Sequence, residues 1–219
     1  MTKQKQHQNL SQSRDGGYTI IESLVAMIVV SAMMIMIAPV MAFSVATRVQ
    51  ARRTELATQA AKAYIDGLRS QSIKFDDPDI KGFPAKSTAT TPETLATTQV
   101  PGNKDDLYCV DMDGDVDMNG DGCETSSTKD FYVQGAWLNP DSSITNNDPT
   151  LKGYQLLVRV YRADSFAPGV TLEPPQVKKQ SVVGSGLGDR TRPVVEMSTE
   201  IPASGKPSYK SILERLKKP

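Results

Sequence analysis

A run of 25 residues without a single charge, residues 23–47, constrains this chain more than any other feature of its sequence. As a helix rising about 1.5 Å per residue, the run would be roughly 37 Å long, enough to cross a hydrocarbon core of about 30 Å. Residues 1–17 carry three basic side chains and one acidic side chain, a net charge of +2. Because basic flanks stay in the cytoplasm, we expect the C-terminal bulk on the far side of the membrane.

Two general interpretations of this run are open beside a more specific one. A cleaved secretory signal has an apolar region of about 7–15 residues followed by small residues, and residues 40–42 or 44–46 would serve as its cleavage site. A plain signal anchor accounts for the length alone. Neither explains Gly17 beside the run or Glu22 at its start, because a carboxylate in lipid costs several kcal/mol unless it has a partner.

The sequence around that glutamate resembles the cleavage and methylation motif of type IV prepilins and type II secretion pseudopilins. The motif is Gly17 followed by Tyr-Thr-Ile-Ile-Glu-Ser-Leu-Val-Ala. The resemblance implies that a membrane-embedded prepilin peptidase cuts after Gly17 and that Tyr18 becomes the N-methylated first residue of the mature chain. Glu22 is then its fifth residue, and Pro39 stands where the family often has a proline. Tyr at the first mature position is a departure from the commoner Phe or Met.

A chain of this family would be a structural subunit, a minor pilin or pseudopilin, and not an enzyme. Its implied partners are the prepilin peptidase, other pilin or pseudopilin subunits, an inner-membrane assembly platform and membrane lipid. The implied location is the inner membrane, crossed once, with the C-terminal domain periplasmic or extracellular until assembly into a filament. In such a filament Glu22 can pair with the free amine of a neighbouring Tyr18, which offsets the burial of both charges and sets the axial register.

The N-terminal helix is expected to continue well beyond the apolar run, from about residue 19 to residue 73. Charged residues appear from Arg48 onward while small and apolar residues keep helical spacing, so segment 18–75 has a membrane-spanning half at 20–47 and an amphipathic half. Pro39 removes a backbone donor and should bend or locally melt the helix. A stripe of small residues, Ala60, Ala63 and Gly67, suits close packing against a sheet.

The predicted fold class is α+β and pilin-like: a small antiparallel sheet packed on the amphipathic half of the helix. Three stretches have strand patterns, residues 131–138, 155–162 and 194–201, and turn-forming residues separate them. A short helical piece is expected within residues 92–97. The globular domain is predicted to cover residues 76–203, and the basic tail 204–219 has too few apolar residues to pack, so disorder is its default.

The most site-like segment is an Asp-rich stretch within residues 105–128, which hold eight acidic residues and no basic one. Calcium loops place oxygen ligands at alternate positions, with Gly at the sharp bend. Counting from Asp115 puts Ser126 where Glu is required, and counting from Asp113 puts Met118 where Gly is required. A loop like those of calcium-binding extracellular repeats is the closer likeness, and a solvated acidic turn that binds nothing is the alternative. The expected calcium ligands are Asp113, Asp115, Asp117, Asn119, Asp121 and Glu124.

Cys109 and Cys123 bracket this stretch. If the C-terminal domain lies outside the cytoplasm, it lies where thiols oxidise, so we expect a disulfide that closes about 15 residues and stabilises the domain by roughly 3 kcal/mol. Two free buried thiols are the alternative. A metal site that uses both sulfurs lacks His partners.

Charge and composition exclude several function classes. Lys and Arg number 25, as do Asp and Glu, so nothing favours a nucleic-acid partner. The single histidine, His7, lies before the apolar run, which argues against His-dependent hydrolases and HExxH metalloenzymes. The Cys-flanked acidic loop and residues 191–201 also resemble the cyanobacterial pseudopilins of hormogonium polysaccharide secretion, which would make an exopolysaccharide the cargo. The alternative function is a membrane-anchored, calcium-dependent extracellular binding module.

Overall fold

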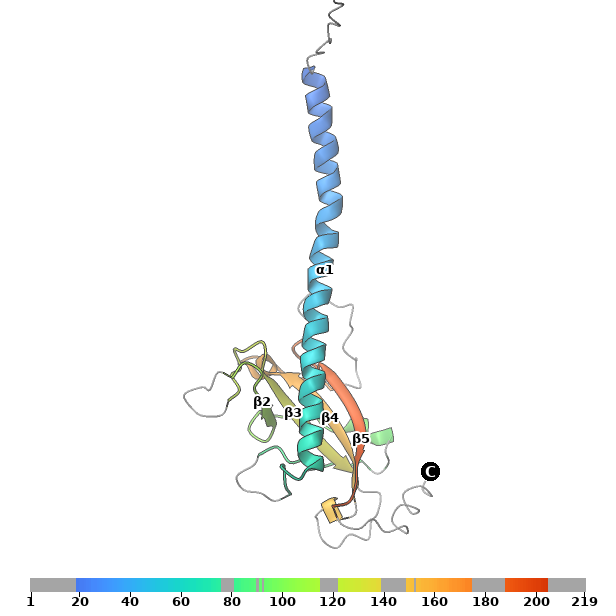
Figure 1. The fold of residues 1–219 in the computed structure, drawn as a ribbon, viewed down its shortest axis with the longest axis vertical. Helices are drawn as coiled ribbons and strands as arrows, with labels where there is room; N and C mark the ends of the chain where they lie inside the picture. Colours follow the sequence, from blue (N-terminus) through green and yellow to red (C-terminus); the bar gives the residue numbers. More distant parts are fainter. Residues whose placement is uncertain are drawn as a thin grey trace, which may run out of the picture. The chain divides into compact units, whose positions relative to one another are not determined.

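A computed structural model describes residues 19–75, 81–89, 91, 93–114, 122–138, 149–151, 153–174 and 188–204 of the chain. The chain divides into two compact units, Met1–Ser44 and Val45–Pro219, and each is considered by itself. The described part of the first unit is helical. The second unit holds the end of the same helix and a five-stranded sheet, so the predicted α+β layout is seen in it (Figure 1).

Helix α1 covers Ile20–Arg69, and Thr19 caps its start. The backbone N–H of Glu22 donates to Thr19 Oγ1 at 3.3 Å and to the Thr19 carbonyl oxygen at 3.0 Å. These bonds satisfy a donor that the first helical turn leaves open. The helix continues through Pro39, so the local melting that a proline can cause is not observed there.

The C-terminal end of α1 comes earlier than predicted, at Arg69 instead of about residue 73. Gln71 takes a left-handed conformation, with φ of 60°, which stops the helix. Ser72 and Ile73 then donate their backbone N–H groups to the Gly67 carbonyl oxygen at 2.9 and 3.1 Å. A reversal of the chain at Gln71 therefore ends the helix before the predicted residue 73.

Three strands form the body of the sheet: β3 (Phe131–Leu138), β4 (Tyr154–Arg162) and β5 (Val195–Ile201). Each pairs antiparallel with the next, as the sequence predicted to within one residue at each end. Two short strands join the other edge of β3. Strand β2 (Tyr108–Val110) pairs with it antiparallel, but β1 (Ala85–Lys86) pairs with it in parallel. The sheet is therefore mixed, and the prediction of a purely antiparallel sheet was wrong.

The amphipathic part of α1 packs on one face of this sheet through small side chains. Ala57, Ala60 and Ala61 are fully buried against the strands, in one cluster with Phe131 and Val133. Burial of apolar surface stabilises by about 25 cal/mol per Å² and is the main stabilising contribution in this unit. Gly67 is half-buried, but Ala63 is exposed, so its predicted place in the small-residue stripe was wrong.

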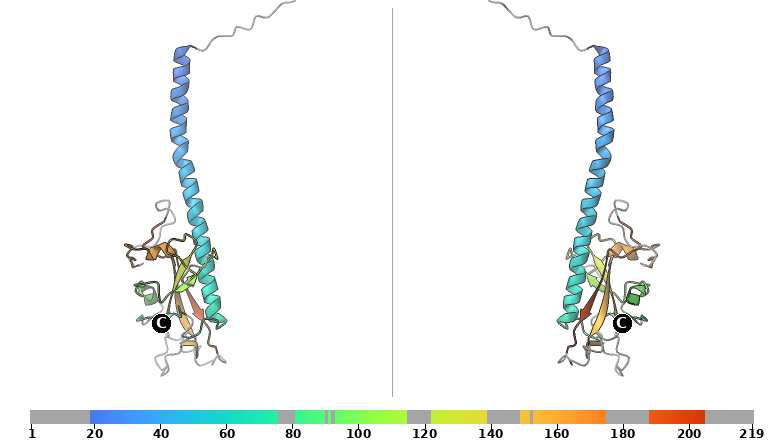
Figure 2. Two further views of the ribbon diagram at one scale, coloured as in Figure 1. Left: turned by 90° about the vertical axis from the view of Figure 1, so that its left-hand side faces the viewer. Right: turned by 90° about the vertical axis from the view of Figure 1, so that its right-hand side faces the viewer.

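The opposite face of the sheet is covered as well, which explains why β3 and β4 show almost no exposed residue. The 3₁₀ helix η1 (Glu93–Thr97) places Leu95 against Leu138 and Leu157. Figure 2 shows the end of α1 along one face of the strands and η1, in green, on the other. Two further 3₁₀ turns are η2 (Pro149–Leu151) and η3 (Ala163–Phe166). The predicted helical piece near residue 95 is thus a 3₁₀ helix.

One charged side chain, Arg159 of β4, is fully buried on this second face. Its guanidinium donates to the carbonyl oxygens of Ala96 and Thr98 at 2.6 and 2.7 Å, and to Glu196 at 2.8 Å. A buried charge of this kind is tolerated only when it is paired and hydrogen-bonded. Arg159 therefore ties the η1 segment to the sheet.

Candidate functional site

The N-terminal part of α1 is the first candidate site. Its apolar side chains are exposed throughout the first unit, and α1 is long and apolar enough to cross a membrane. It is therefore a candidate membrane anchor, although a signal sequence near an N-terminus also satisfies these criteria of length and composition. The large exposed apolar residues before the second unit are Ile20, Ile21, Leu24, Val25, Met27, Ile28, Val29, Val30, Met33, Met34, Ile35, Met36, Ile37, Val40, Met41 and Phe43.

Glu22 lies exposed in the first turn of this helix. An acidic side chain there interacts favourably with the positive end of the helix dipole, so Glu22 also has a purely local role. Within the described residues it forms no ion pair. Gly17 and Tyr18, the predicted processing residues, lie outside the described residues.

The Asp-rich segment contains the second candidate site. Three carboxylates, those of Asp111, Asp113 and Asp130, meet there, with one oxygen from each within 4.8 Å of the other two. Asp111 directly follows β2, and Asp130 directly precedes β3. The antiparallel pairing of Val110 with Phe131 brings these two aspartates together.

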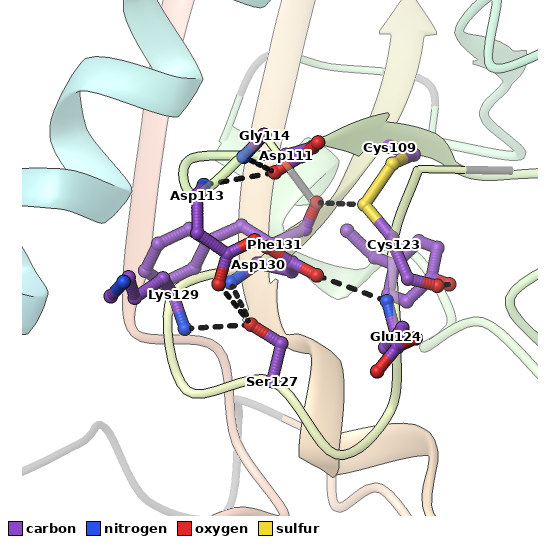
Figure 3. Close-up of a disulfide and its surroundings, with 11 residues drawn as sticks. Cys109, Asp111, Asp113, Gly114, Cys123, Glu124, Ser127, Lys129, Asp130 and Phe131 are labelled. Atoms are coloured by element: carbon purple, nitrogen blue, oxygen red, sulfur yellow. Dashed lines mark hydrogen bonds between the residues drawn. A yellow bond between two sulfur atoms is a disulfide. The ribbon is translucent and has the colours of Figure 1, made fainter. Parts of the chain in front are cut away.

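The hydrogen bonds around this cluster fix each carboxylate (Figure 3). Asp111 Oδ1 accepts the backbone N–H groups of Asp113 and Gly114 at 2.9 and 2.8 Å. Asp113 Oδ2 accepts the Ser127 hydroxyl at 3.2 Å. Asp130 Oδ2 accepts the Glu124 N–H at 3.0 Å, and Asp130 Oδ1 is buried without a hydrogen-bond partner.

The electrostatic environment differs among the three. The backbone N–H of Gly114, followed by that of Asp113, lowers the pKa of Asp111. Desolvation by burial raises the pKa of Asp130, and the neighbouring charges of Asp113 and Asp111 add to this rise. The cluster thus combines an anion held by N–H donors with a buried carboxyl group that resists ionisation.

Of the two predicted calcium ligands that the structure describes, Asp113 and Glu124, it brings Asp113 into this cluster. Asp115, Asp117, Asn119 and Asp121 lie outside the described residues. The Glu124 carboxylate accepts the Ser126 hydroxyl at 3.0 Å. Glu124 contacts the cluster through its backbone N–H, which donates to Asp130.

Sequence reasoning missed Asp111 and Asp130 as members of this acidic cluster. Asp111 stands in the same alternating run as Asp113, so the spacing already contained a signal for it. Asp130 stands 17 residues after Asp113, directly before a predicted strand, and only the pairing of β2 with β3 reveals its position.

The predicted disulfide between Cys109 and Cys123 is confirmed, with a Cα–Cα distance of 6.0 Å. Cys123 is buried, and its carbonyl oxygen accepts the Tyr132 hydroxyl at 3.1 Å. Figure 3 shows the bond beside the acidic cluster. Gly122, with φ of 70°, lies next to Asp111 and Cys109, where a side chain would strain the backbone.

Comparison with known proteins gives no relative: no protein-family model, no curated protein and no solved structure matches this chain.

Proposed function

We propose that this chain is a structural subunit, a minor pilin or pseudopilin, of a filament of the type IV pilus or type II secretion kind. In this proposal the prepilin peptidase cuts after Gly17, and Tyr18 becomes the N-methylated first residue. The freed helix then leaves the lipid and packs among sister helices, with the help of an inner-membrane assembly platform. The filament serves polysaccharide secretion or surface motility.

The observation that carries this proposal is where α1 begins. Thr19 caps the helix two residues after the proposed cleavage site, so the new amine of Tyr18 would stand directly before the first turn. From Ile20 to Ser44 the helix is exposed along its whole length. An apolar surface of this size needs lipid or other helices around it. The membrane would supply lipid before assembly, and the filament core would supply neighbouring helices afterwards.

Glu22 has the central part in assembly. It is the one charged residue between Ile20 and Thr47, and in an apolar environment an unpaired carboxylate costs several kcal/mol. The ammonium group of a neighbouring Tyr18 would offset that cost. Since only one axial offset between two helices brings these groups together, the pair would also set the register of the filament.

The test is filament incorporation of Glu22→Ala and Glu22→Gln. Both variants should enter the membrane fraction at the normal level and be absent from sheared filaments. The matched control is Glu55→Gln, which removes the same charge from an exposed position of α1 where Glu55 pairs with Arg52 at 2.9 Å. It should assemble normally. Normal incorporation of both Glu22 variants would contradict the proposed assembly role.

The second candidate is a membrane-anchored, calcium-dependent binding module for extracellular ligands. The cluster of Asp111, Asp113 and Asp130 favours it, because calcium modules hold their ion with such oxygen ligands. The two candidates differ at the N-terminus of the mature chain, since only the filament subunit requires cleavage after Gly17.

A further inference from the structure

A buried oxygen without a partner marks the acidic cluster as an incomplete site. Asp130 is 1% exposed, and its Oδ1 has no hydrogen-bond partner. The other oxygen, Oδ2, is held by the Glu124 N–H, so the carboxylate cannot turn away without losing that bond. Buried polar atoms are nearly always satisfied, and a bound ion is one of the few explanations for an exception.

The carboxylate that carries this oxygen has two acidic neighbours. One carboxylate oxygen each of Asp111, Asp113 and Asp130 lies within 4.8 Å of the others, and no Lys or Arg among the described residues forms an ion pair with any of the three. Like charges at this separation repel when all are ionised. A cation between them reverses the sign of each interaction, so the arrangement suits a bound cation better than an empty site.

We propose that Asp111, Asp113 and Asp130 bind one calcium ion. Calcium takes carboxylate oxygens at about 2.3–2.6 Å, so two of its ligands can lie up to about 5.2 Å apart. The three oxygens, each within 4.8 Å of the other two, meet this limit. Magnesium binds at about 2.0–2.1 Å and requires a nearly octahedral shell, whereas calcium accepts a more flexible geometry. Asp111 is only half-buried, which leaves room for water to complete the larger calcium shell.

The ion would join two segments that are distant in sequence. Asp111 and Asp113 follow β2, and Asp130 directly precedes β3. Bound calcium would fasten the end of one strand to the start of its partner, on the same side as the disulfide. This inference concerns the second unit alone and does not depend on the proposed filament role.

The experiment uses the full-length chain in mild detergent, stripped with chelator, and calcium chloride as the probe. Calorimetry should find one calcium ion per chain. Calcium at ten times its dissociation constant should raise the melting temperature by about 3–6 °C, as expected for a chain of this size. Magnesium at the same concentration should give a smaller rise.

The variants Asp130→Asn and Asp111→Asn should each weaken calcium binding at least tenfold. Asp106→Asn removes the same charge from an exposed position just before β2 and should bind calcium as the unaltered chain does. A further readout separates a metal ligand from a structural residue. In chelator Asp130→Asn should be at least as stable as the unaltered chain, because it keeps an acceptor for the Glu124 N–H and removes the repulsion. In calcium it should be less stable.

Three results would overturn the proposal. The first is an unaltered chain that binds no calcium at 10 mM. That concentration exceeds the dissociation constants of the weakest extracellular calcium modules, which are about 10⁻⁴–10⁻³ M. The second is normal calcium affinity in Asp111→Asn. This result can be interpreted even if the variant of the buried Asp130 fails to fold. The third is an equal loss of stability in Asp130→Asn with and without calcium. Failure here would leave the cleavage of the N-terminus and the Glu22 test untouched.

Discussion

Gly135 of β3 leaves room for the Tyr64 side chain of α1, so Gly135→Ala should destabilise the second unit strongly. A Cβ atom built at Gly135 would lie 2.3 Å from the Tyr64 hydroxyl oxygen and 2.9 Å from Pro84 Cβ. That hydroxyl donates to the Gly82 carbonyl oxygen at 2.7 Å and has no empty space to move into, because Tyr64 is fully buried.

The size of the effect follows from these distances. Overpacking a core costs about 1–3 kcal/mol, and leaving a buried hydroxyl without its acceptor costs about 1–3 kcal/mol more. Glycine-to-alanine changes elsewhere stabilise by about 0.4–1 kcal/mol through the unfolded state. The net loss for Gly135→Ala should therefore be about 2–4 kcal/mol.

Urea unfolding of the full-length chain in non-ionic detergent measures this loss. Trp137 is the only tryptophan of the chain, is 4% exposed and lies two residues from Gly135, so its fluorescence reports on the same core. Gly102→Ala is the matched control, because a Cβ at Gly102 meets nothing within 4 Å. The control should change the unfolding free energy by less than about 0.5 kcal/mol.

A double-mutant cycle with Tyr64→Phe identifies the cause. Removing the hydroxyl removes the closest contact of the new Cβ, so Gly135→Ala should cost about 1–2 kcal/mol less in the Tyr64→Phe background. Strictly additive losses, or a loss below 0.5 kcal/mol for Gly135→Ala alone, would refute the packing of α1 on β3 described above.

Three further predictions concern the second unit. Replacing Cys109 and Cys123 by Ser removes a cross-link over 14 positions and should lower the unfolding free energy by about 3 kcal/mol, measured by the same urea unfolding. Among the described residues, Glu196 is the one carboxylate that pairs with the fully buried Arg159, so Glu196→Gln should cost about 1–3 kcal/mol by the same assay. Burial raises the pKa of Tyr161 to about 12 from 10.0, so the folded chain keeps the proton of this hydroxyl to higher pH than the unfolded chain does. The contribution of Tyr161 to the unfolding free energy should therefore be fully present below pH 10 and fall by about 1.4 kcal/mol per pH unit from pH 10 to 12.

Each of these has a contrary outcome. Equal stability of the oxidised and the serine-substituted chain would show that the disulfide closes a loop already ordered in the unfolded state. A neutral Glu196→Gln would mean that the two carbonyl bonds alone satisfy Arg159. If Tyr161→Phe has the same alkaline unfolding curve as the unaltered chain, burial of that hydroxyl does not govern the loss.

Local sequence patterns predicted the elements that carry their own signal. The charge-free run predicted the helix, because a long apolar segment is recognised from its own residues. The strands β3 and β4 contain apolar runs long enough to be read directly. Strands β1 and β2, with two and three residues, are too short for any alternation and exist only because β3 pairs with them.

The parts that could not be predicted depend on contacts between distant residues. Asp130 looks like any acid before a strand until the register of β2 against β3 places it beside Asp111. Arg159 stands in a strand where alternation would send it to solvent, and it is buried because the η1 segment supplies two carbonyl oxygens above it. In both cases the sequence shows the residue but does not show which distant residues lie beside it in the fold.

Mass spectrometry of the mature N-terminus tests the central claim most directly. The chain isolated from cells that contain a prepilin peptidase should begin at Tyr18 and carry one methyl group on its amine. A chain that begins at Met1, or at Phe43 after a conventional secretory cut, would contradict the claim that α1 is the stem of a filament subunit.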